Sequence, residues 1–165
     1  MTGSEAEVLD FLEWFCDQPY KHKIFIAGNH DMCLYGANID GLDENVHCLC
    51  NSSVVIDGVK FYGVPMFMED CVTDRQSHNY ARIPADTDVL ITHTPPLEIL
   101  DFDDDIHYGS DELLTKVKEV KPRLHLFGHV HRDRGLEHIG STTYSNATIL
   151  CSAYTYLQQP NVLEI

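Results

Sequence analysis

The 165-residue sequence contains no long apolar run, so no membrane-spanning helix is expected, since such a helix needs roughly 18 apolar residues. The opening residues 1–5 have neither a basic region nor an apolar core, and no secretory signal is expected there. Basic residues are scarce: 11 Lys and Arg stand against 26 Asp and Glu, a net charge of −15. This charge argues against binding to nucleic acid or to an anionic membrane.

Cysteine is present, but not in a pattern typical of a structural zinc site. No Cys-x-x-Cys occurs, and Cys48-x-Cys50 on an apolar strand is poor spacing for a zinc ligand pair. Without a secretory signal, we expect reduced thiols in a cytoplasmic protein; disulfides are the less favoured alternative. The six cysteines are Cys16, Cys33, Cys48, Cys50, Cys71 and Cys151.

Hydrophobic periodicity predicts alternating helices and short strands within a single domain over residues 1–165. Ser4-x-x-Glu7 is a capping-box pattern, and apolar residues at helical spacing follow it to Cys16, which predicts a helix over 5–17. Asp57-Gly58 between two apolar runs predicts a hairpin. A further helix is expected over 110–120 and a short one near 75–82. The predicted strands cover 23–27, 46–50, 54–64, 89–91, 123–127, 136–139, 142–150 and 162–165. This order indicates a layered α/β fold.

Three of these strands share one feature, a polar ending that carries Asn or His. Asn29-His30 follows the first strand, His93 follows the strand at 89–91, and His129-x-His131 follows the strand at 123–127. Because ligands gather at the carboxyl ends of parallel strands, these side chains converge if the three strands are parallel neighbours.

The chemistry of these endings favours a metal site. Gly128 permits a sharp turn that would bring His129 and His131 to the same side, since residues i and i+2 of an extended strand point apart. Neutral imidazole and amide oxygen suit zinc, manganese or iron. A lone His at a strand end, such as His93, is more often an ordinary polar residue, but three such endings together favour metal binding.

The remaining histidines and the acidic loop carry simpler interpretations. His125 lies within a strand and is expected to be a hydrogen-bonded core residue. The acidic stretch Asp101–Asp105 could hold a metal, but a solvated loop is the favoured interpretation. The histidines expected at the surface are His22, His47, His78, His107 and His138.

The polar endings resemble a known family. Gly28-Asn29-His30-Asp31, Thr92-His93 and Gly128-His129-Val130-His131 are similar to motifs III, IV and V of the calcineurin-like metallophosphoesterases. The stretches "IPADTDVLITHTPPLEILD" and "KPRLHLFGHVHRDRG" are similar to the metallophosphodiesterase branch of that superfamily. The resemblance implies a layered α/β/β/α sandwich.

The resemblance also implies a metal-dependent phosphohydrolase. Asn29, His93 and His129 resemble ligands of one divalent ion (Mn, Fe or Zn), and His131 resembles a ligand of a second ion. The implied reaction is attack on a phosphate mono- or diester by metal-activated hydroxide. The implied partner is a small phosphate ester.

Two residues resemble the catalytic part of the family's site. His30 resembles the histidine that binds the scissile phosphate and protonates the leaving group. Asp31 is expected to orient the neighbouring loop without touching metal.

The family's motifs I (Asp-x-His) and II (Gly-Asp) would precede the helix that begins near Glu5, and neither does so here. The fold is therefore expected to lack its first two strands, which would leave the 23–27 strand with an unpaired edge prone to self-association. One metal is then expected in place of two. We expect a phosphohydrolase truncated at its start; the alternative is a short, inactive paralogue that retains one metal site and acts by binding. A nuclease is disfavoured by the negative charge.

Overall fold

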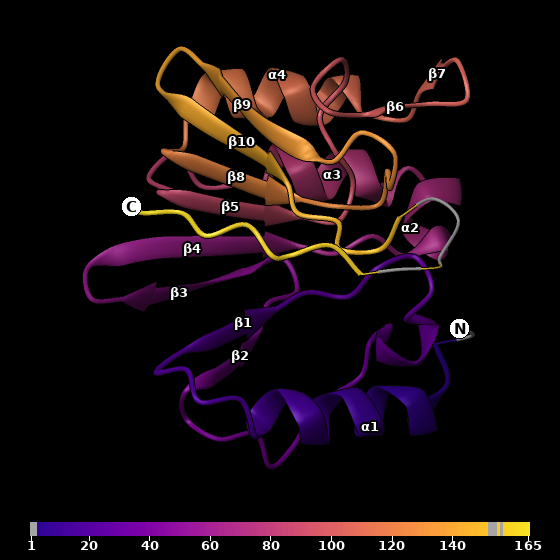
Figure 1. Ribbon diagram of the computed structural model, residues 1–165, viewed down its shortest axis with the longest axis vertical. Helices are drawn as coiled ribbons and strands as arrows, with labels where there is room; N and C mark the ends of the chain where they lie inside the picture. The colour runs from indigo at the N-terminus through magenta and orange to yellow at the C-terminus, as the bar shows by residue number, and fades with distance from the viewer. Residues whose placement is uncertain (1–2, 152–154, 156) are drawn as a thin grey trace.

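The computed structural model describes residues 3–151, 155 and 157–165 (Figure 1). In chain order the elements are α1 (Glu5–Cys16), β1 (Lys23–Phe25), the 3-10 helix η1 (Met32–Leu34), β2 (Val46–Cys48), β3 (Ser52–Ile56), β4 (Val59–Val64), α2 (Met68–Val72), α3 (Arg75–Ala81), β5 (Val89–Thr92), β6 (Phe102–Asp103), β7 (Ile106–His107), α4 (Asp111–Val120), β8 (Leu124–Phe127), β9 (Gly135–Ile139) and β10 (Thr142–Asn146). In these residues the strands form a six-stranded sheet, a two-stranded sheet (β1 and β2) and a short two-stranded hairpin (β6 and β7).

The smaller sheet consists of β1 and β2 in parallel, with α1 beneath it (Figure 1). The predicted capping box is present: Ser4 Oγ accepts from Glu7 N, and Glu7 Oε2 accepts from Ser4 N. The apolar face of α1 buries Val8 and Leu12 against the small sheet. Among the described residues, β1 pairs with no strand other than β2, so its second edge is open.

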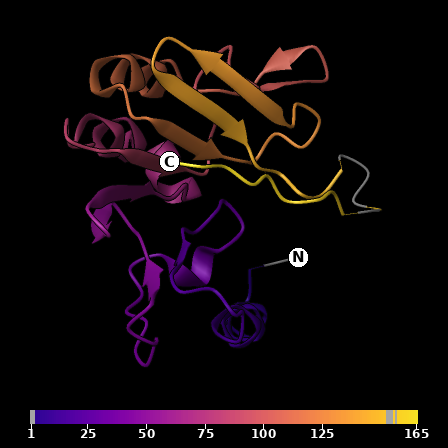
Figure 2. The same cartoon turned by 60° about the vertical axis from the view of Figure 1, so that its left-hand side comes forward.

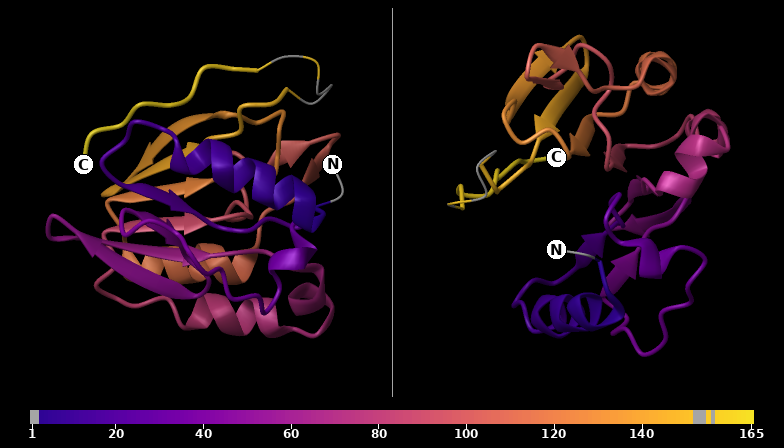
Figure 3. Two further views of the ribbon diagram at one scale, coloured as in Figure 1. Left: turned by 90° about the horizontal axis from the view of Figure 1, so that it is seen from below. Right: turned by 90° about the vertical axis from the view of Figure 1, so that its right-hand side faces the viewer.

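The larger sheet has six strands in the order β3-β4-β5-β8-β10-β9. The four central strands run parallel, while β3 and β9 pair antiparallel at the two edges. Helices α3 and α4 lie on one side of this sheet, and the C-terminal segment crosses the other side (Figures 1 and 3). The core beneath the helices includes Tyr62, Val64, Leu90, Leu113, Val117 and Phe127.

The small sheet contacts the large sheet near the end of β4. Met66 N donates to Ala27 O at 3.3 Å. Gly63 allows the close contact, because a Cβ there would lie 2.3 Å from Leu49 Cβ. Figure 2, in which α1 is seen nearly end-on, shows the small sheet beside the large one. The mixed α/β class predicted from the sequence is confirmed.

The strand of the first polar ending, β1, lies in the small sheet and not beside β5 and β8, because β4 occupies that edge of β5. The condition under which the three endings were expected to converge, that their strands are parallel neighbours, is therefore not met by β1. The strand predicted over 46–50 forms over Val46–Cys48 and pairs with β1. Two predicted details are wrong. The strand predicted over 142–150 ends at Asn146, and its continuation to 150 is irregular. No strand forms over 162–165.

The predicted hairpin at Asp57-Gly58 and the helices over 75–82 and 110–120 are confirmed within one or two residues. Ser110 caps α4 by accepting from Leu113 N at 3.1 Å. None of the helices in the described part of the chain is long and apolar enough to span a membrane.

Candidate metal centre

The first polar ending forms a compact loop, residues 28–36, which we call the GNHD loop. Asp31 Oδ2 accepts from Gly28 N at 2.7 Å, and Asp31 N donates to Gly28 O at 3.1 Å. These two bonds close the turn from both sides. The bond from Gly28 N to the Asp31 carboxylate agrees with the expected role of Asp31 in orienting the loop. The neighbouring His30 is exposed to solvent.

The GNHD loop contacts the large sheet through Asn29. Asn29 Oδ1 lies 2.8 Å from His93 Nε2, and because an amide oxygen only accepts, His93 Nε2 carries the hydrogen. Gly28 permits this approach: a Cβ on it would come within 2.6 Å of His93 Cε1. The requirement for glycine here is therefore close packing against an imidazole rather than an unusual φ angle.

The third polar ending, residues 128–131, is a tight turn that we call the GHVH turn. Gly128 N donates to His93 O at 3.2 Å, which joins this turn to the end of β5. Val130 N donates to Gly128 O at 2.8 Å, and His129 between them has φ +70°, the geometry of a γ-turn. The prediction that Gly128 makes the turn is wrong, because the left-handed residue is His129 itself. Such backbone strain in a non-glycine residue is commonly found at functional sites.

The histidines of these endings lie close enough to influence one another electrostatically. The rings of His93 and His129 have centroids 4.9 Å apart. Burial, followed by the charges of His129, His30 and His131, lowers the pKa of His93 to about 3. Burial, followed by the charges of His131 and His30, also lowers the pKa of His129. Both imidazoles are therefore neutral at pH 7, as a metal ligand must be.

The Asn29–His93 pair fits part of one ion's coordination sphere. Two donor atoms bound about 2.1 Å from the same ion lie about 3.0–3.4 Å apart, so the observed 2.8 Å needs only a small opening and a shift of the His93 ring hydrogen from Nε2 to Nδ1. His129 is the next donor in reach. Within residues 3–151, 155 and 157–165, however, no three His, Cys, Asp or Glu side chains are grouped closely enough to hold a metal by themselves. The ligand set is thus partial.

A comparison with protein-family models decides the family. The calcineurin-like phosphoesterase (Metallophos) model matches residues 2–133, most of the chain and all three polar endings. The chain belongs to the calcineurin-like phosphoesterase family. Membership confirms the resemblance that the three polar endings indicated.

Relatives of this phosphoesterase-family chain are found in a nematode and in mammals. The chain is 38% identical to UPF0046 protein C25E10.12 of Caenorhabditis elegans, with 92% of this chain and 66% of that protein covered. It is 32% identical to the human metallophosphoesterase domain-containing protein 1, with 99% of this chain and 61% of that protein covered. The chain therefore spans less than two thirds of the length of these curated relatives.

The fold of the chain is similar to that of solved structures. One crystal structure superimposes with a TM-score of 0.62 at 20% identity, over 84% of this chain and 61% of the other. The protein TT1561 of Thermus thermophilus superimposes with a TM-score of 0.50 at 15% identity, over 75% of this chain and 61% of the other. At these identities the likeness concerns the fold alone.

The sequence did not single out the residues that brace the candidate site. Asn146, at the end of β10, donates to Val130 O inside the GHVH turn. It is a fourth polar strand ending, and its signal was obscured because the strand was expected to continue to 150. Thr92 Oγ1 donates to Thr94 O at 2.6 Å and therefore accepts from His125 Nε2 at 2.9 Å. His125 is fully buried, which confirms the predicted core histidine.

The GNHD loop is anchored by a polar cluster on the helices. Asp70, 6% exposed, accepts from Tyr35 Oη at 3.1 Å, from Arg75 Nε at 3.0 Å and from Asn79 Nδ2 at 3.2 Å. Tyr35 also packs edge-on against Phe67, with ring centroids 5.1 Å apart. These contacts fasten the end of the loop to α2 and α3.

The acidic stretch is exposed at Asp104 and Asp105, as predicted for a solvated loop, but not at Asp101. Asp101 is 1% exposed and accepts from His107 Nδ1 at 2.6 Å and from Gly109 N at 3.0 Å. Phe102 N donates to Asp133 Oδ2 at 2.9 Å, which ties the β6–β7 hairpin to the chain after the GHVH turn. Asp101 pairing also gives the exposed His107 a partner that the sequence did not suggest.

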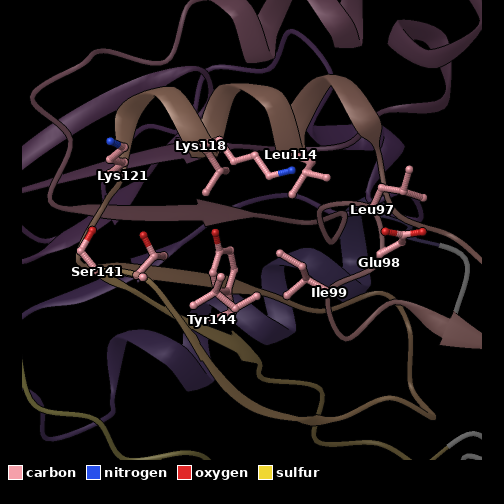
Figure 4. Close-up of a pocket in the computed structure, with 12 residues that line it drawn as sticks. Leu97, Glu98, Ile99, Leu114, Lys118, Lys121, Ser141 and Tyr144 are labelled. Atoms are coloured by element: carbon pink, nitrogen blue, oxygen red, sulfur yellow. The ribbon is translucent and has the colours of Figure 1, made fainter.

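The other predicted surface histidines are His22, His78 and His138, which are exposed, and His47, which is half-buried. A groove of about 490 Å³ opens elsewhere, between α4 and the β9–β10 turn (Figure 4). Leu114, Lys118 and Tyr144 line it, and none of the predicted metal or catalytic residues does.

Proposed function

We propose that the chain carries a metal-dependent phosphohydrolase site where the GNHD loop meets the GHVH turn. The observation that carries this proposal is the 2.8 Å contact between Asn29 Oδ1 and His93 Nε2, formed by motifs from two different sheets. His129 lies beside this pair. Family membership supports the reaction class, hydrolysis of a phosphate mono- or diester.

Asn29, His93 and His129 would hold a divalent ion, and His131 would contribute toward a second. Their neutral imidazoles and amide oxygen suit manganese, iron or zinc. When bound, such an ion lowers the pKa of water and polarises phosphate oxygens. The strained backbone at His129 and the Gly128 N to His93 O bond hold two of these donors in fixed relation.

His30 would bind the scissile phosphate and donate a proton to the leaving oxygen. Its exposed ring can meet a substrate from solvent, and its charge lowers the pKa of both His93 and His129, so it lies near them. Asp31 would act on His30 indirectly, because its carboxylate fixes the turn through Gly28 N.

The wider setting is part of the proposal. The substrate would be a small phosphate ester, since a net charge of −15 disfavours nucleic acid and anionic membranes. The open edge of β1 offers a surface for self-association.

The cysteines of the described residues form no disulfide with one another, which suits a cytoplasmic protein. We further propose that residues 1–165 form one domain of the layered α/β/β/α sandwich type.

One observation favours a second candidate, a protein that binds one metal without hydrolysis. Among the described residues no carboxylate joins the histidines to complete a metal-binding group. A bridging carboxylate would otherwise offset the repulsion between two dications. This candidate predicts at most one bound ion and no turnover.

The two candidates are separated by metal content and turnover of the purified chain. After incubation with Mn²⁺, Fe²⁺ or Zn²⁺ and removal of free metal, bound ions are measured by mass spectrometry. Hydrolysis of bis(p-nitrophenyl) phosphate and p-nitrophenyl phosphate is then measured. The matched variants are His93→Ala, His30→Ala and His78→Ala, the last an exposed histidine on α3 that serves as control.

If the chain hydrolyses phosphate esters, His93→Ala should abolish metal binding. His30→Ala should keep the metal and lower turnover by roughly 100-fold. His78→Ala should behave like the parent. Bound metal without turnover establishes the binding-protein alternative. A chain that binds no metal under any of these conditions contradicts both candidates.

A further inference from the structure

Asn146 is the last residue of β10 and is completely buried. Its Nδ2 donates to Val130 O at 2.8 Å and to Leu100 O at 3.0 Å, and its Oδ1 accepts from Thr148 N at 3.2 Å. Every polar atom of the side chain is therefore used. In the parallel pair of β10 and β8, Asn146 lies opposite Phe127, immediately before the GHVH turn.

The bond to Val130 fixes the central peptide of that turn. Val130 N donates to Gly128 O within the γ-turn, and Val130 O accepts from Asn146. The chain between His129 and His131 is thus held at both polar groups of Val130. Because His129 has φ +70°, its backbone would relax toward a more common conformation without such bracing.

The bond to Leu100 joins a second segment to the same amide. Residues 97–110 follow His93 closely, and the neck of this segment is closed by hydrogen bonds between Leu97 N and Ser110 O and between Ser110 N and Pro95 O. Asn146 thus links the segment that follows His93 to the turn that carries His129. A single side chain therefore joins the turn that bears His129 and His131 to the segment that follows His93.

We propose that Asn146 is a positioning residue of the metal site, which sets the distance and orientation of His129 relative to His93. This inference rests on the proposed metal-binding function. An apolar side chain of similar size would fill the same space, but it would leave the carbonyls of Val130 and Leu100 without their donor. The amide therefore does something that packing alone does not require.

The test compares Asn146→Asp, which keeps the shape but loses both N–H donors, with a matched control on the same strand. Thr142→Val serves as control, because Thr142 is buried and its Oγ1 donates to Pro122 O at 2.7 Å at the opposite end of β10. Where Asn146→Asp does not fold, Asn146→Ala replaces it. The measurements are Zn²⁺ affinity by calorimetry, amide hydrogen exchange at Val130, and stability in urea.

Loss of such an outer partner typically weakens metal binding by roughly 10- to 100-fold, and we expect this for Asn146→Asp and Asn146→Ala. We also expect Val130 to exchange at least about tenfold faster, since its bond to Gly128 O depends on the held turn. Thr142→Val should lose stability but keep the parent's Zn²⁺ affinity and Val130 exchange rate.

The proposal is overturned if the Asn146 variants bind Zn²⁺ like the parent, whether or not Val130 exchanges faster. It is also overturned if Thr142→Val weakens Zn²⁺ binding equally, because the loss would then follow general stability. If the parent chain binds no Zn²⁺, the proposed function fails. In that case exchange at Val130 decides the inference: faster exchange in the Asn146 variants supports a braced turn, and unchanged exchange overturns it.

Discussion

The two halves of the candidate site are supported in different ways. The GHVH turn and His93 extend from adjacent parallel strands of the six-stranded sheet, and Gly128 N to His93 O joins them directly. The GNHD loop extends from a two-stranded sheet whose other edge is open among the described residues. Its fastening comes from side chains instead: the Asp31 turn and the Asp70 cluster.

The two halves of the candidate site are therefore expected to differ in how rigidly they are held. The half borne by the large sheet is fixed by backbone bonds and buried packing, so its imidazoles are held before any ligand arrives. The GNHD loop depends on a few polar contacts and is expected to open at lower free energy. On the more adaptable half, Asn29 is proposed to join His93 and His129 as a ligand of the ion, and His30 is proposed to bind the substrate.

The largest expected effect is acid destabilisation of the large-sheet half. Burial lowers the pKa of His125 to about 3, so the unfolded chain binds this proton first as pH falls through about 6.5. The contribution of neutral His125 to the free energy of unfolding is therefore complete above about pH 6.5, and it is lost as the pH decreases toward the pKa of His125 in the folded chain. Two pH units below 6.5, His125 alone should cost about 2–3 kcal/mol.

Urea unfolding of the parent and of His125→Leu at pH 7.5 and 4.5 measures this effect. The stability of the parent should fall further between the two pH values than that of the variant. His93, whose pKa is also lowered to about 3, contributes in the same direction in both proteins. An equal fall in both proteins would show that the buried His125 does not carry the effect.

The next effect concerns the anchor of the GNHD loop. Asp70→Ala removes the shared acceptor of Tyr35, Arg75 and Asn79, and we expect a loss of about 2 kcal/mol because the buried Asn79 amide is left without it. Amide exchange over residues 31–36 should accelerate while that over 128–131 stays unchanged. Equal acceleration in both segments would contradict independent support of the two halves.

Asp86→Ala is the control for the Asp70 variant. Asp86 Oδ1 accepts from Lys60 Nζ at 2.7 Å, but the Asp86 side chain is 74% exposed. Such surface pairs contribute little to stability, so urea unfolding should detect no change.

A smaller effect distinguishes the glycines of the two motifs. Gly28→Ala places a Cβ within 2.6 Å of the His93 ring, and overpacking of this kind should cost about 1–2 kcal/mol and weaken metal binding. In Gly128→Ala the new Cβ would meet only Thr148 Oγ1, at 3.5 Å, so stability should be nearly unchanged. Urea unfolding and Zn²⁺ titration of both variants make the comparison. Equal losses of stability and of Zn²⁺ affinity in the two variants would refute the close-packing role of Gly28.

The smallest effect concerns His107 at the edge of the site. Its hydrogen bond to Asp101 raises its pKa, so the pair stabilises the fold below the ordinary His pKa, and the contribution disappears as pH rises through the raised value. His107→Gln should therefore lower stability more at pH 5.5 than at pH 8.5, as measured by urea unfolding. A larger loss at pH 8.5 would contradict this direction.

The sequence predicted much of the site because its signals are local. Several features can be predicted from neighbouring residues alone: the capping at Ser4, the Asp57-Gly58 hairpin, and the polar endings with Asn29, His93 and His129. These signals led to the family, which the comparison with family models confirmed. The roles of the individual residues remain predictions.

What the sequence did not predict depends on distant contacts. The pairing of β1 with β2 and the position of β4 beside β5 are tertiary choices that strand periodicity does not encode. Asp101 looked solvated because its neighbours are acidic, yet its partners are His107 and backbone amides. Asn146 was missed for a different reason: an overlong predicted strand placed it in the interior instead of at the end.

The most direct test of the central claim is anomalous diffraction at the zinc edge from crystals of the chain soaked in Zn²⁺. The account predicts an ion about 2.0–2.2 Å from both Asn29 Oδ1 and His93 Nε2, with His129 next to it. A zinc ion bound only elsewhere, such as at the acidic stretch 101–105, or no ion at the Asn29–His93 pair at saturating Zn²⁺, would contradict it.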